Sequence, residues 1–337
     1  MITQNGFRKF VFALLRFALP ALIIGYLLWR IDVDDWQLIE KQQKHWGLIA
    51  GASGLSLFAT VLSFIRWWLL VHALSISLSM VEAIKLGAIG HFLSYVSAGS
   101  IGGDLFKGVF LAHRSPGKRI ESVASIGVDR VIGLTGLLIV VTTALICFPP
   151  SSLDPVMVTV RHVTFVVTPL ILLGLCGLVF GGRLVDRALL LVRRIPKIGR
   201  GLFRLAEFVR FFDHHRGVVF IAIAMSVTIH CMLVLAVDLI ARGLFESPPT
   251  LVEHLVIVPC GLTAGALPIT PAGLGVFEAA LDHLYRVVPS VPTTASGTLV
   301  ALIYDMIRLL IAVIGVVFFW TAGRELRTSG LHFTEPK

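Results

Sequence analysis

Charged residues are scarce in this sequence, and no polar stretch is long. Aspartate, glutamate, lysine and arginine together make up 15% of its 337 residues, whereas a soluble protein has about 25%. The longest polar segment, residues 181–216, is too short to form a soluble catalytic domain. Hydrophobic residues make up 56% of the chain, which is more than a soluble globule can bury and excludes a disordered chain. The composition therefore predicts a membrane protein that crosses the bilayer several times.

Cysteines are few, and motifs for metal binding or catalysis are missing. The four cysteines, Cys147, Cys176, Cys231 and Cys260, lie singly in apolar runs and form no CxxC pair. This spacing predicts small core residues rather than disulfides or metal ligands. The sequence also lacks a nucleotide-binding glycine loop and a Ser/His/Asp arrangement. We therefore expect no metal and no cofactor, and we find no catalytic motif that would make the protein an enzyme.

The net charge of +9 does not indicate a nucleic-acid partner. The basic residues cluster between apolar runs, as they do in the cytoplasmic loops of inner-membrane proteins. Six of these runs are long enough to cross the hydrocarbon core, which needs about 20 apolar residues. They are 10–29, 47–70, 120–147, 157–180, 217–242 and 297–322. The first run has no small-residue cleavage site after it, so we interpret it as a span that is retained rather than a signal peptide.

Two further apolar regions are interrupted near their middles. Region 82–112 contains a glycine-rich break at 97–104, and region 250–288 contains a break rich in proline and glycine at 267–275. Each half has about 15 apolar residues, which is too short to cross alone, so each region predicts a re-entrant helical hairpin. The alternative is that every half crosses completely, which would leave the orientation of the later segments unchanged.

The distribution of lysine and arginine predicts the orientation of the chain. If both hairpins return to their own side, the arginine-rich segment 181–216 becomes a basic cytoplasmic connector, and both termini are cytoplasmic. The loops near 149–150 and 248–249 have no lysine or arginine and are placed outside. This is the positive-inside pattern of a multi-pass protein of the inner, or cytoplasmic, membrane.

The order of elements repeats within the chain. Segments 47–147 and 217–322 both run span, broken hairpin, span, and the two hairpins enter from opposite sides. Few residues are identical, so chance similarity is the alternative. We predict an all-α integral membrane protein, residues 1–337, with about six full transmembrane helices and two re-entrant hairpins arranged as inverted repeats. Secondary transporters often have this architecture.

Two pairs of charges lie inside apolar runs. Asp129 and Arg130 are about 13 Å into their span, and Asp305 and Arg308 are about 12 and 16 Å from the opposite face, at about 1.5 Å per residue. Burying one such charge costs about 2.5–3.5 kcal/mol. We predict a charged cavity between the repeats, in which Arg130 and Arg308 hold an anionic group while Asp129 and Asp305 hold the arginines. The alternative is that the pairs only fasten helices together.

The hairpin tips are the second predicted part of this site. The tip residues expected to bind the anion are Gly102, Gly103, Thr270, Gly273 and Gly275. Each second arm would begin inside the membrane with free N–H groups, and Thr270 would cap the later one. The alternative is that the glycines only permit close helix packing. The flanking charges, Asp104, Lys107 and Glu278, are candidate gating or coupling groups.

Other polar residues in apolar runs are predicted to be structural. The sequence Arg66-Trp67-Trp68 is typical of an interfacial anchor. His91 and His230 are lone histidines that we interpret as hydrogen-bonded core residues. Asp238 and Arg242 are spaced for an ion pair at a helix end.

Four of these motifs resemble the lysylphosphatidylglycerol synthase transmembrane family, whose flippase-like domain also occurs alone. They are Arg66-Trp67-Trp68, Gly102-Gly103-Asp104, Asp129-Arg130 and residues 267–278. The resemblance extends over nearly the whole chain. It implies a bacterial inner-membrane protein that translocates lipids or lipid-linked groups. The soluble aminoacyl-transferase domain of bifunctional members is not expected, because the chain ends soon after its last span.

The first functional hypothesis is therefore a lipid translocase that binds an anionic headgroup between the hairpins. One alternative is an intramembrane transferase or phosphatase that acts on polyprenyl-phosphate or a lipid-linked sugar, with Asp104, Asp129 or Glu278 as base. Another is a non-catalytic accessory subunit of a hopanoid or glycolipid pathway. The expected partners are a membrane phospholipid or a polyprenyl or hopanoid lipid, and either a second copy of the chain or a lipid-modifying enzyme.

Overall fold

The computed structural model describes residues 25, 29, 43–96, 101–149, 154–180, 215–266, 270 and 273–328. Within these residues every regular element is a helix, as predicted. The helices are α3 (Trp46–Ala73), α4 (Met80–Val96), α5 (Ile101–Arg114), the short 3-10 helix η1 (Pro116–Lys118), α6 (Arg119–Cys147), α7 (Pro155–Phe180), α10 (Arg216–Leu244), α11 (Leu251–Gly265), α12 (Val276–Val287) and α13 (Gly297–Thr328).

Five helices in the described ranges are long and apolar enough to cross a membrane, namely α3, α6, α7, α10 and α13. They coincide with five of the six predicted spans. The remaining one, 10–29, lies outside the described residues apart from Gly25 and Trp29, and most of the basic connector 181–216 lies outside them too. The structure therefore supports a multi-pass membrane protein.

The two interrupted regions form two pairs of short helices, α4 with α5 and α11 with α12. In the first pair, Glu82 Oε1 near the start of α4 lies 2.5 Å from Arg114 Nη1 at the end of α5. In the second, Glu253 Oε1 near the start of α11 accepts hydrogen bonds from the backbone N–H and hydroxyl of Ser290, which follows α12. Each pair therefore begins and ends at the same place.

The starts of both pairs are fixed by the same local motif. A serine or threonine followed three residues later by glutamate forms a capping box, which satisfies two N–H groups at a helix start. Ser79 and Glu82 form one at α4, with the Ser79 N–H donating to Glu82 Oε2 at 2.9 Å. Thr250 and Glu253 form the other at α11, with the corresponding distance of 2.8 Å. In each pair, one glutamate therefore caps the start of the first helix and also contacts the end of the second.

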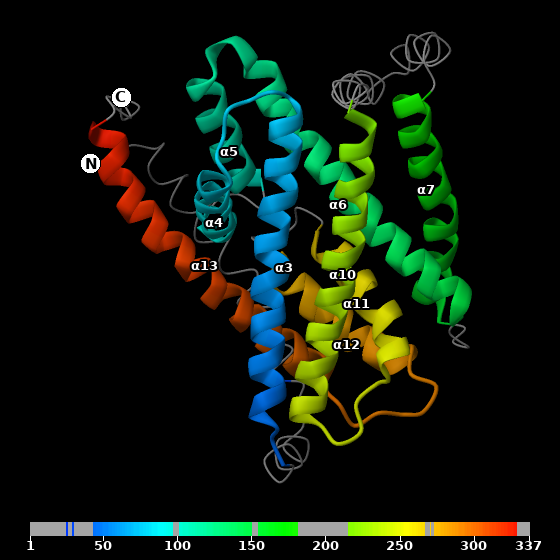
Figure 1. The fold of residues 1–337 in the computed structure, drawn as a ribbon. Helices are drawn as coiled ribbons and strands as arrows, with labels where there is room; N and C mark the ends of the chain where they lie inside the picture. Colours follow the sequence, from blue (N-terminus) through cyan, green and yellow to red (C-terminus); the bar gives the residue numbers. More distant parts are fainter. Residues whose placement is uncertain are drawn as a thin grey trace, which may run out of the picture.

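The two pairs lie toward opposite ends of the helix bundle (Figure 1). At one end, the Lys118 ammonium donates to the Leu74 carbonyl, which joins the end of α3 to the start of α6. At the other end, the His45 N–H donates to the Gly243 carbonyl, which joins the start of α3 to the end of α10. The start of α4 and the end of α5 lie at the first of these ends, and the start of α11 and the end of α12 lie at the second.

The helices of the two halves pack against each other. Helices α3 and α10 run side by side through the centre (Figure 1). Helix α4 packs against α13 of the other half, and α11 packs against α6. Close packing is possible because small residues lie at the contacts: a Cβ added to Gly315 would be 2.1 Å from the Ala88 carbonyl oxygen. Helices of each half therefore contribute to the contact between the two halves.

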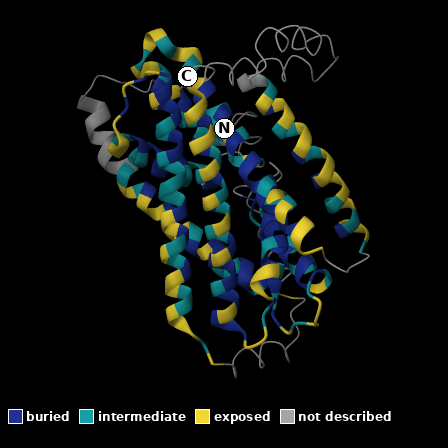
Figure 2. Ribbon diagram, turned by 45° about the vertical axis from the view of Figure 1, so that its right-hand side comes forward, coloured by how far each residue is buried: buried dark blue, intermediate teal, exposed yellow. Residues whose placement is uncertain are grey.

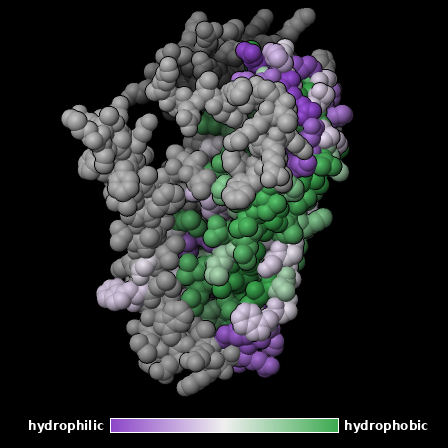
Figure 3. Space-filling view, turned by 90° about the vertical axis from the view of Figure 1, so that its left-hand side faces the viewer, coloured by the Kyte–Doolittle hydropathy of each residue, from purple (hydrophilic) through white to green (hydrophobic). Residues whose placement is uncertain are grey.

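The outer faces of the long helices are exposed (Figure 2), and many of the exposed side chains are large and apolar. Leu170 and Leu173 of α7 are 62% and 69% exposed, and Leu310 of α13 is 67% exposed. On the face seen in Figure 3, hydrophobic residues form a belt with hydrophilic residues at its two ends. A surface of this kind is stable in contact with lipid chains rather than water.

Candidate functional site

A cavity of about 550 Å³ lies where α3, α4, α5, α6, α10 and α13 meet the break between α11 and α12. Its wall combines apolar side chains with an unusual number of titratable ones. The titratable residues that line it are Arg66, His91, Tyr95, Asp104, Lys107, Asp129, Arg130, His230, Tyr304 and Arg308. Most of the charges that the sequence indicated in the two halves therefore surround one space.

Arg66 and Asp129 form the first ion pair in the wall, with Arg66 Nε 2.9 Å from Asp129 Oδ1. Arg66 is only 6% exposed, so the prediction that it anchors the protein at the membrane interface is wrong. Helix α3 continues seven residues beyond it to Ala73. Gly133, one turn after Asp129, leaves room for the guanidinium, because a Cβ there would be 3.4 Å from Arg66 Nη2.

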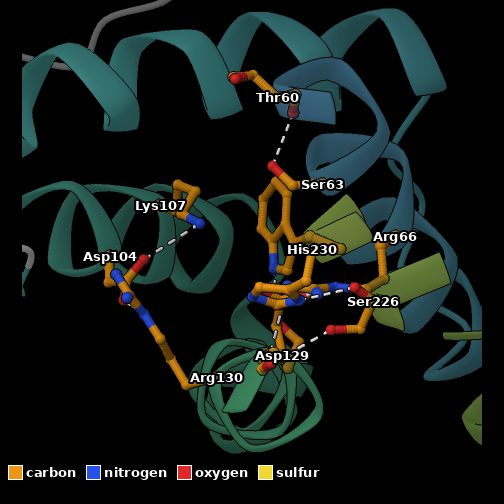
Figure 4. A network of polar contacts seen from close by, with 12 residues as sticks. Thr60, Ser63, Arg66, Asp104, Lys107, Asp129, Arg130, Ser226 and His230 are labelled. Carbon is orange, nitrogen blue, oxygen red and sulfur yellow. Dashed lines mark hydrogen bonds and ion pairs between the residues drawn. The ribbon is translucent and has the colours of Figure 1, made fainter. Parts of the chain in front are cut away.

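Arg130 contacts a different carboxylate from the one predicted. Its Nε lies 2.5 Å from Asp104 Oδ2 of α5, and Lys107 Nζ lies 3.2 Å from Asp104 Oδ1 (Figure 4). The prediction that Asp129 holds Arg130 is corrected, because neighbouring residues of a helix point in different directions and do not face each other. Lys107 Nζ also lies 5.0 Å from the centre of the Trp67 ring, a cation–π contact.

Arg308 brings a cationic group from the second half of the chain. Its Nη1 lies 2.7 Å from Asp305 Oδ1, one turn earlier on α13, so the predicted pairing of these two residues is present. The aromatic rings of Tyr95 and Tyr304 lie 6.0 and 5.6 Å from the guanidinium carbon. Stacking on these rings holds the guanidinium plane against the cavity wall.

The two lone histidines both line the cavity. His230 Nδ1 is 2.7 Å from the Ser226 carbonyl oxygen, in keeping with the predicted hydrogen-bonded core histidine. The ring of His91 lies edge-on to Tyr95, with centroids 5.6 Å apart, and His91 Nε2 is buried without a hydrogen-bond partner in the described ranges. Nothing in the spacing of either histidine indicated that it belongs to the site.

Only some of the predicted tip residues line the cavity. Thr270 and Gly273 line the cavity, and the Thr270 hydroxyl is buried without a hydrogen-bond partner among the described residues. Gly102, Gly103 and Gly275 are not among the lining residues. The other residues of the two breaks, 97–100, 267–269 and 271–272, lie outside the described part of the chain.

Glycine at the tips permits close approach of the two arms of each pair. A Cβ on Gly103 would be 1.9 Å from the Gly90 carbonyl oxygen, and one on Gly273 would be 2.3 Å from that of Gly265. Gly273 also has a φ of +78°, which L side chains rarely adopt. These glycines therefore shape the tips by letting backbone meet backbone.

Helix α12 begins at Val276, with Gly275 as its N-cap, so the prediction that Thr270 caps it is wrong. The Gly275 N–H donates instead to Glu278 Oε2 at 2.7 Å. A carboxylate three residues into a helix commonly folds back in this way, because the N-terminal dipole attracts negative charge. The start of α12 is thus partly satisfied by its own glutamate, and Glu278 and Asp305 lie behind the lining residues.

The charges that line the cavity have an excess of cations. The cationic side chains are Arg66, Lys107, Arg130 and Arg308, and the carboxylates among the lining residues are Asp104 and Asp129. Asp305, which pairs with Arg308 from outside the lining set, offsets one of these cations, and the positive charge that remains on the wall favours an anion. Guanidinium groups also match the geometry of phosphate and carboxylate oxygens, to which they donate two parallel hydrogen bonds.

Comparison with known proteins identifies the family of the chain. Residues 11–315 match the family described as lysylphosphatidylglycerol synthase TM region. No curated protein and no solved structure matches the chain. The family indicates a membrane protein with a lipid-related function. Because the match extends over most of the sequence, the chain belongs to the lysylphosphatidylglycerol synthase TM region family.

Proposed function

We propose that the protein is a lipid translocase that binds an anionic headgroup in the central cavity. The observation that carries this proposal is the set of four cationic side chains from α3, α5, α6 and α13 around one cavity of about 550 Å³. The lipid-related function of the family supports it. The cargo class is a membrane phospholipid or a polyprenyl or hopanoid lipid with a charged headgroup.

The phosphate is held by Arg130 and Arg308, with Arg66 and Lys107 adding positive charge. Each of these cations has a carboxylate within 3.2 Å. These pairs compensate the charges, since an unpaired buried charge is very unfavourable. The headgroup then competes with Asp104 for Arg130 and with Asp305 for Arg308, which allows binding and release.

The two hairpins and the internal repeat suggest how the headgroup crosses the membrane. Helices α4–α5 and α11–α12 act as re-entrant hairpins from opposite faces, and Gly102, Gly103, Gly273 and Gly275 shape their tips. The closed bases at Glu82 and Glu253 support this. So does the mirrored packing of α4 on α13 and α11 on α6. Rocking of segment 47–147 against 217–322 would expose the cavity to either face in turn.

In this proposal the protein lies in the bacterial inner membrane with both termini in the cytoplasm. The acyl chains stay in the bilayer beside the exposed apolar faces of the helices. Thr270, with its unpartnered hydroxyl, donates to the headgroup. Asp104, Lys107, Asp129, Glu278 and Asp305 hold or release the cationic side chains as the cavity opens.

A leaflet-transfer assay tests the proposal. The full-length protein is reconstituted in vesicles with phosphatidylglycerol that carries a headgroup-distal acyl-chain fluorophore, and the rate at which inner-leaflet dye becomes accessible to an added quencher is measured. We expect faster transfer with wild-type protein, and at least a tenfold loss in Arg308→Ala.

The matched control is Arg286→Ala, because Arg286 forms an i,i+4 pair with Asp282 and its side chain is 54% exposed, away from the cavity. Equal loss in both variants, or no transfer by the wild-type protein, would contradict the proposal. Turnover of polyprenyl-phosphate by the same vesicles would favour the enzymatic alternative.

A further inference from the structure

Glu278 is a buried carboxyl group with no cation beside it in the described structure. Its exposed fraction is 0%. Oε2 accepts the Gly275 N–H at 2.7 Å, but Oε1 is buried and has no hydrogen-bond partner among the residues that the structure describes. A buried charged oxygen without a partner is strongly unfavourable, so a compensating group is needed there.

Asp305 is the group that Glu278 faces. Asp305 is 6% exposed, and its Oδ1 accepts from Arg308 at 2.7 Å. Its Oδ2 is buried and receives no hydrogen bond from the described part of the chain. Helices α12 and α13 pack together here, and the rings of Phe277 and Tyr304, the residues just before the two acids, have centroids 5.5 Å apart. The two carboxyl groups are close enough to interact electrostatically. Two acidic groups this close cannot both ionise easily and tend to share one proton.

The other titratable or charged groups around the pair do not replace this proton. On the neighbouring elements they are Arg308 and Tyr304 of α13, Tyr95 and His91 of α4, His254 and Cys260 of α11, and, on the cavity wall, Arg66 of α3, Lys107 of α5 and His230 of α10. Arg308 bonds to Asp305, Arg66 to Asp129 and Lys107 to Asp104. Within the described residues, two carboxyl groups therefore depend on one guanidinium.

The first hairpin provides an internal comparison. Asp104 lies near the start of α5, as Glu278 does in α12, but it contacts both Lys107, three residues later, and Arg130. The residue three positions after Glu278 is Leu281, which is fully buried. One hairpin thus neutralises its acid with cations, and the other has only an apolar side chain at that position.

From this geometry we infer that Glu278 and Asp305 hold one shared proton, and that this proton binds together with the anionic headgroup. The inference rests on the proposed function. The four cationic groups of the cavity are matched in number by Asp104, Asp129, Asp305 and Glu278 when all four are ionised. One bound proton leaves a single net positive charge, which suits a singly charged headgroup such as a phosphodiester.

The consequence is that headgroup and proton stabilise each other's binding. Such linkage is reciprocal: if a bound headgroup raises proton affinity, a bound proton raises headgroup affinity by the same factor. Movement of the lipid would carry the proton with it, so a proton gradient would drive anionic lipid across the bilayer. Glu278 lies at the tip of the second hairpin, and the first hairpin has no such proton site among its described residues. The inward-facing and outward-facing states of the transport cycle would therefore differ.

The shared proton is tested first by infrared difference spectroscopy of the purified full-length protein. We expect a protonated-carboxyl band near neutral pH that is lost in Glu278→Gln, which leaves Asp305 paired with Arg308. In Asp305→Asn the band should shift, because Glu278 stays protonated without its acidic neighbour. The amide introduced by Glu278→Gln keeps an acceptor for the Gly275 N–H, so folding is preserved. Asp282→Asn is the matched control, because Asp282 lies on the same helix and bonds to Arg286 and Thr298. Absence of the band from the wild-type protein would overturn the shared proton.

Coupling is tested by calorimetric titration with short-chain phosphatidylglycerol in two buffers of different ionisation enthalpy. At a pH above that at which the infrared band is lost from the lipid-free protein, we expect uptake of about one proton per lipid and an affinity that falls about tenfold per pH unit. Glu278→Gln should show no uptake. Binding without proton uptake would overturn the coupling and leave the translocase proposal intact. Failure of the lipid to bind at all would overturn the translocase proposal and the coupling together, while the infrared band would still decide whether the proton is shared.

Discussion

Arg66 of α3 and Asp129 of α6 are 63 positions apart in the sequence, yet they form an ion pair at 2.9 Å in the cavity wall. Their side chains are only 8% and 14% exposed. The pair joins α3 to α6, the two long helices of the first half. Both charges line the cavity that Arg308 reaches from the other half. It is therefore both a structural fastening and part of the site.

We predict that Arg66→Ala lowers the free energy of unfolding by about 3–5 kcal/mol, because it leaves the Asp129 carboxylate buried without its cation. The measurement is denaturant unfolding of the detergent-solubilised protein. The double variant Arg66→Ala/Asp129→Ala should recover part of the loss, since no charge is then stranded. A loss in the double variant equal to the sum of the losses in Arg66→Ala and Asp129→Ala would show that the pair is not coupled.

Gly103→Ala should destabilise the first hairpin. The added methyl group would lie 1.9 Å from the Gly90 carbonyl oxygen, so α4 and α5 must move apart. Overpacking of this kind costs about 1–3 kcal/mol. Thermal unfolding measures it, with Gly117→Ala as control, because a Cβ there meets nothing within 4 Å. If both variants unfold at the same temperature, the close contact between the arms is wrong.

Stability should depend on pH through Glu253, which lies outside the membrane-spanning helices. Burial raises the pKa of this carboxyl group, but hydrogen bonds from Ser290 and Thr250 lower it more, so its pKa is below the ordinary value. The folded protein therefore gains stability from Glu253 above the pKa of the unfolded chain, about 4.3. That stability is lost as the pH falls through the lower pKa of the folded state.

Glu253→Gln should accordingly reduce stability at pH 7 by about 0.5–1 kcal/mol, the usual effect of an exposed cap. The difference from wild type should shrink as the pH falls through and below 4. Glu246→Gln is the control, because Glu246 is exposed in the loop just before this cap. A difference that stays constant between pH 7 and pH 3 would exclude the Glu253 carboxylate as the cause.

The opposite orientation of the hairpins can be tested by labelling. In a background without the four native cysteines, Ser115→Cys follows α5 and Ser290→Cys follows α12. A membrane-impermeant thiol reagent should modify the first only from the cytoplasmic side and the second only from outside. Modification of both from one side would contradict the inverted arrangement.

The long helices could be predicted from the sequence because each is a continuous apolar run of membrane-spanning length. The paired short helices could also be predicted, since their glycine- and proline-rich breaks are obvious. Asp129, Asp305 and Arg308 were recognisable because a charge is rare in such a run. These features depend only on residues close together in the chain.

The pairing of the charges could not be predicted in the same way. Adjacent Asp129 and Arg130 point to different neighbours, Arg66 and Asp104, which come from separate helices. The two tryptophans that follow Arg66 suggested an interfacial residue, although its helix extends further. Glu278 could be recognised as a charge beside a hairpin tip, but its burial could not be predicted, because only the folded hairpin shows that α12 begins at Val276 and that Glu278 accepts from the Gly275 N–H.

The most direct test of the central claim is a density map of the protein in a bilayer that contains phosphatidylglycerol. The account predicts headgroup density inside the cavity, with phosphate oxygens within hydrogen-bonding distance of Arg308 and Arg130. Lipid density confined to the outer apolar faces, with the cavity holding only water, would contradict it.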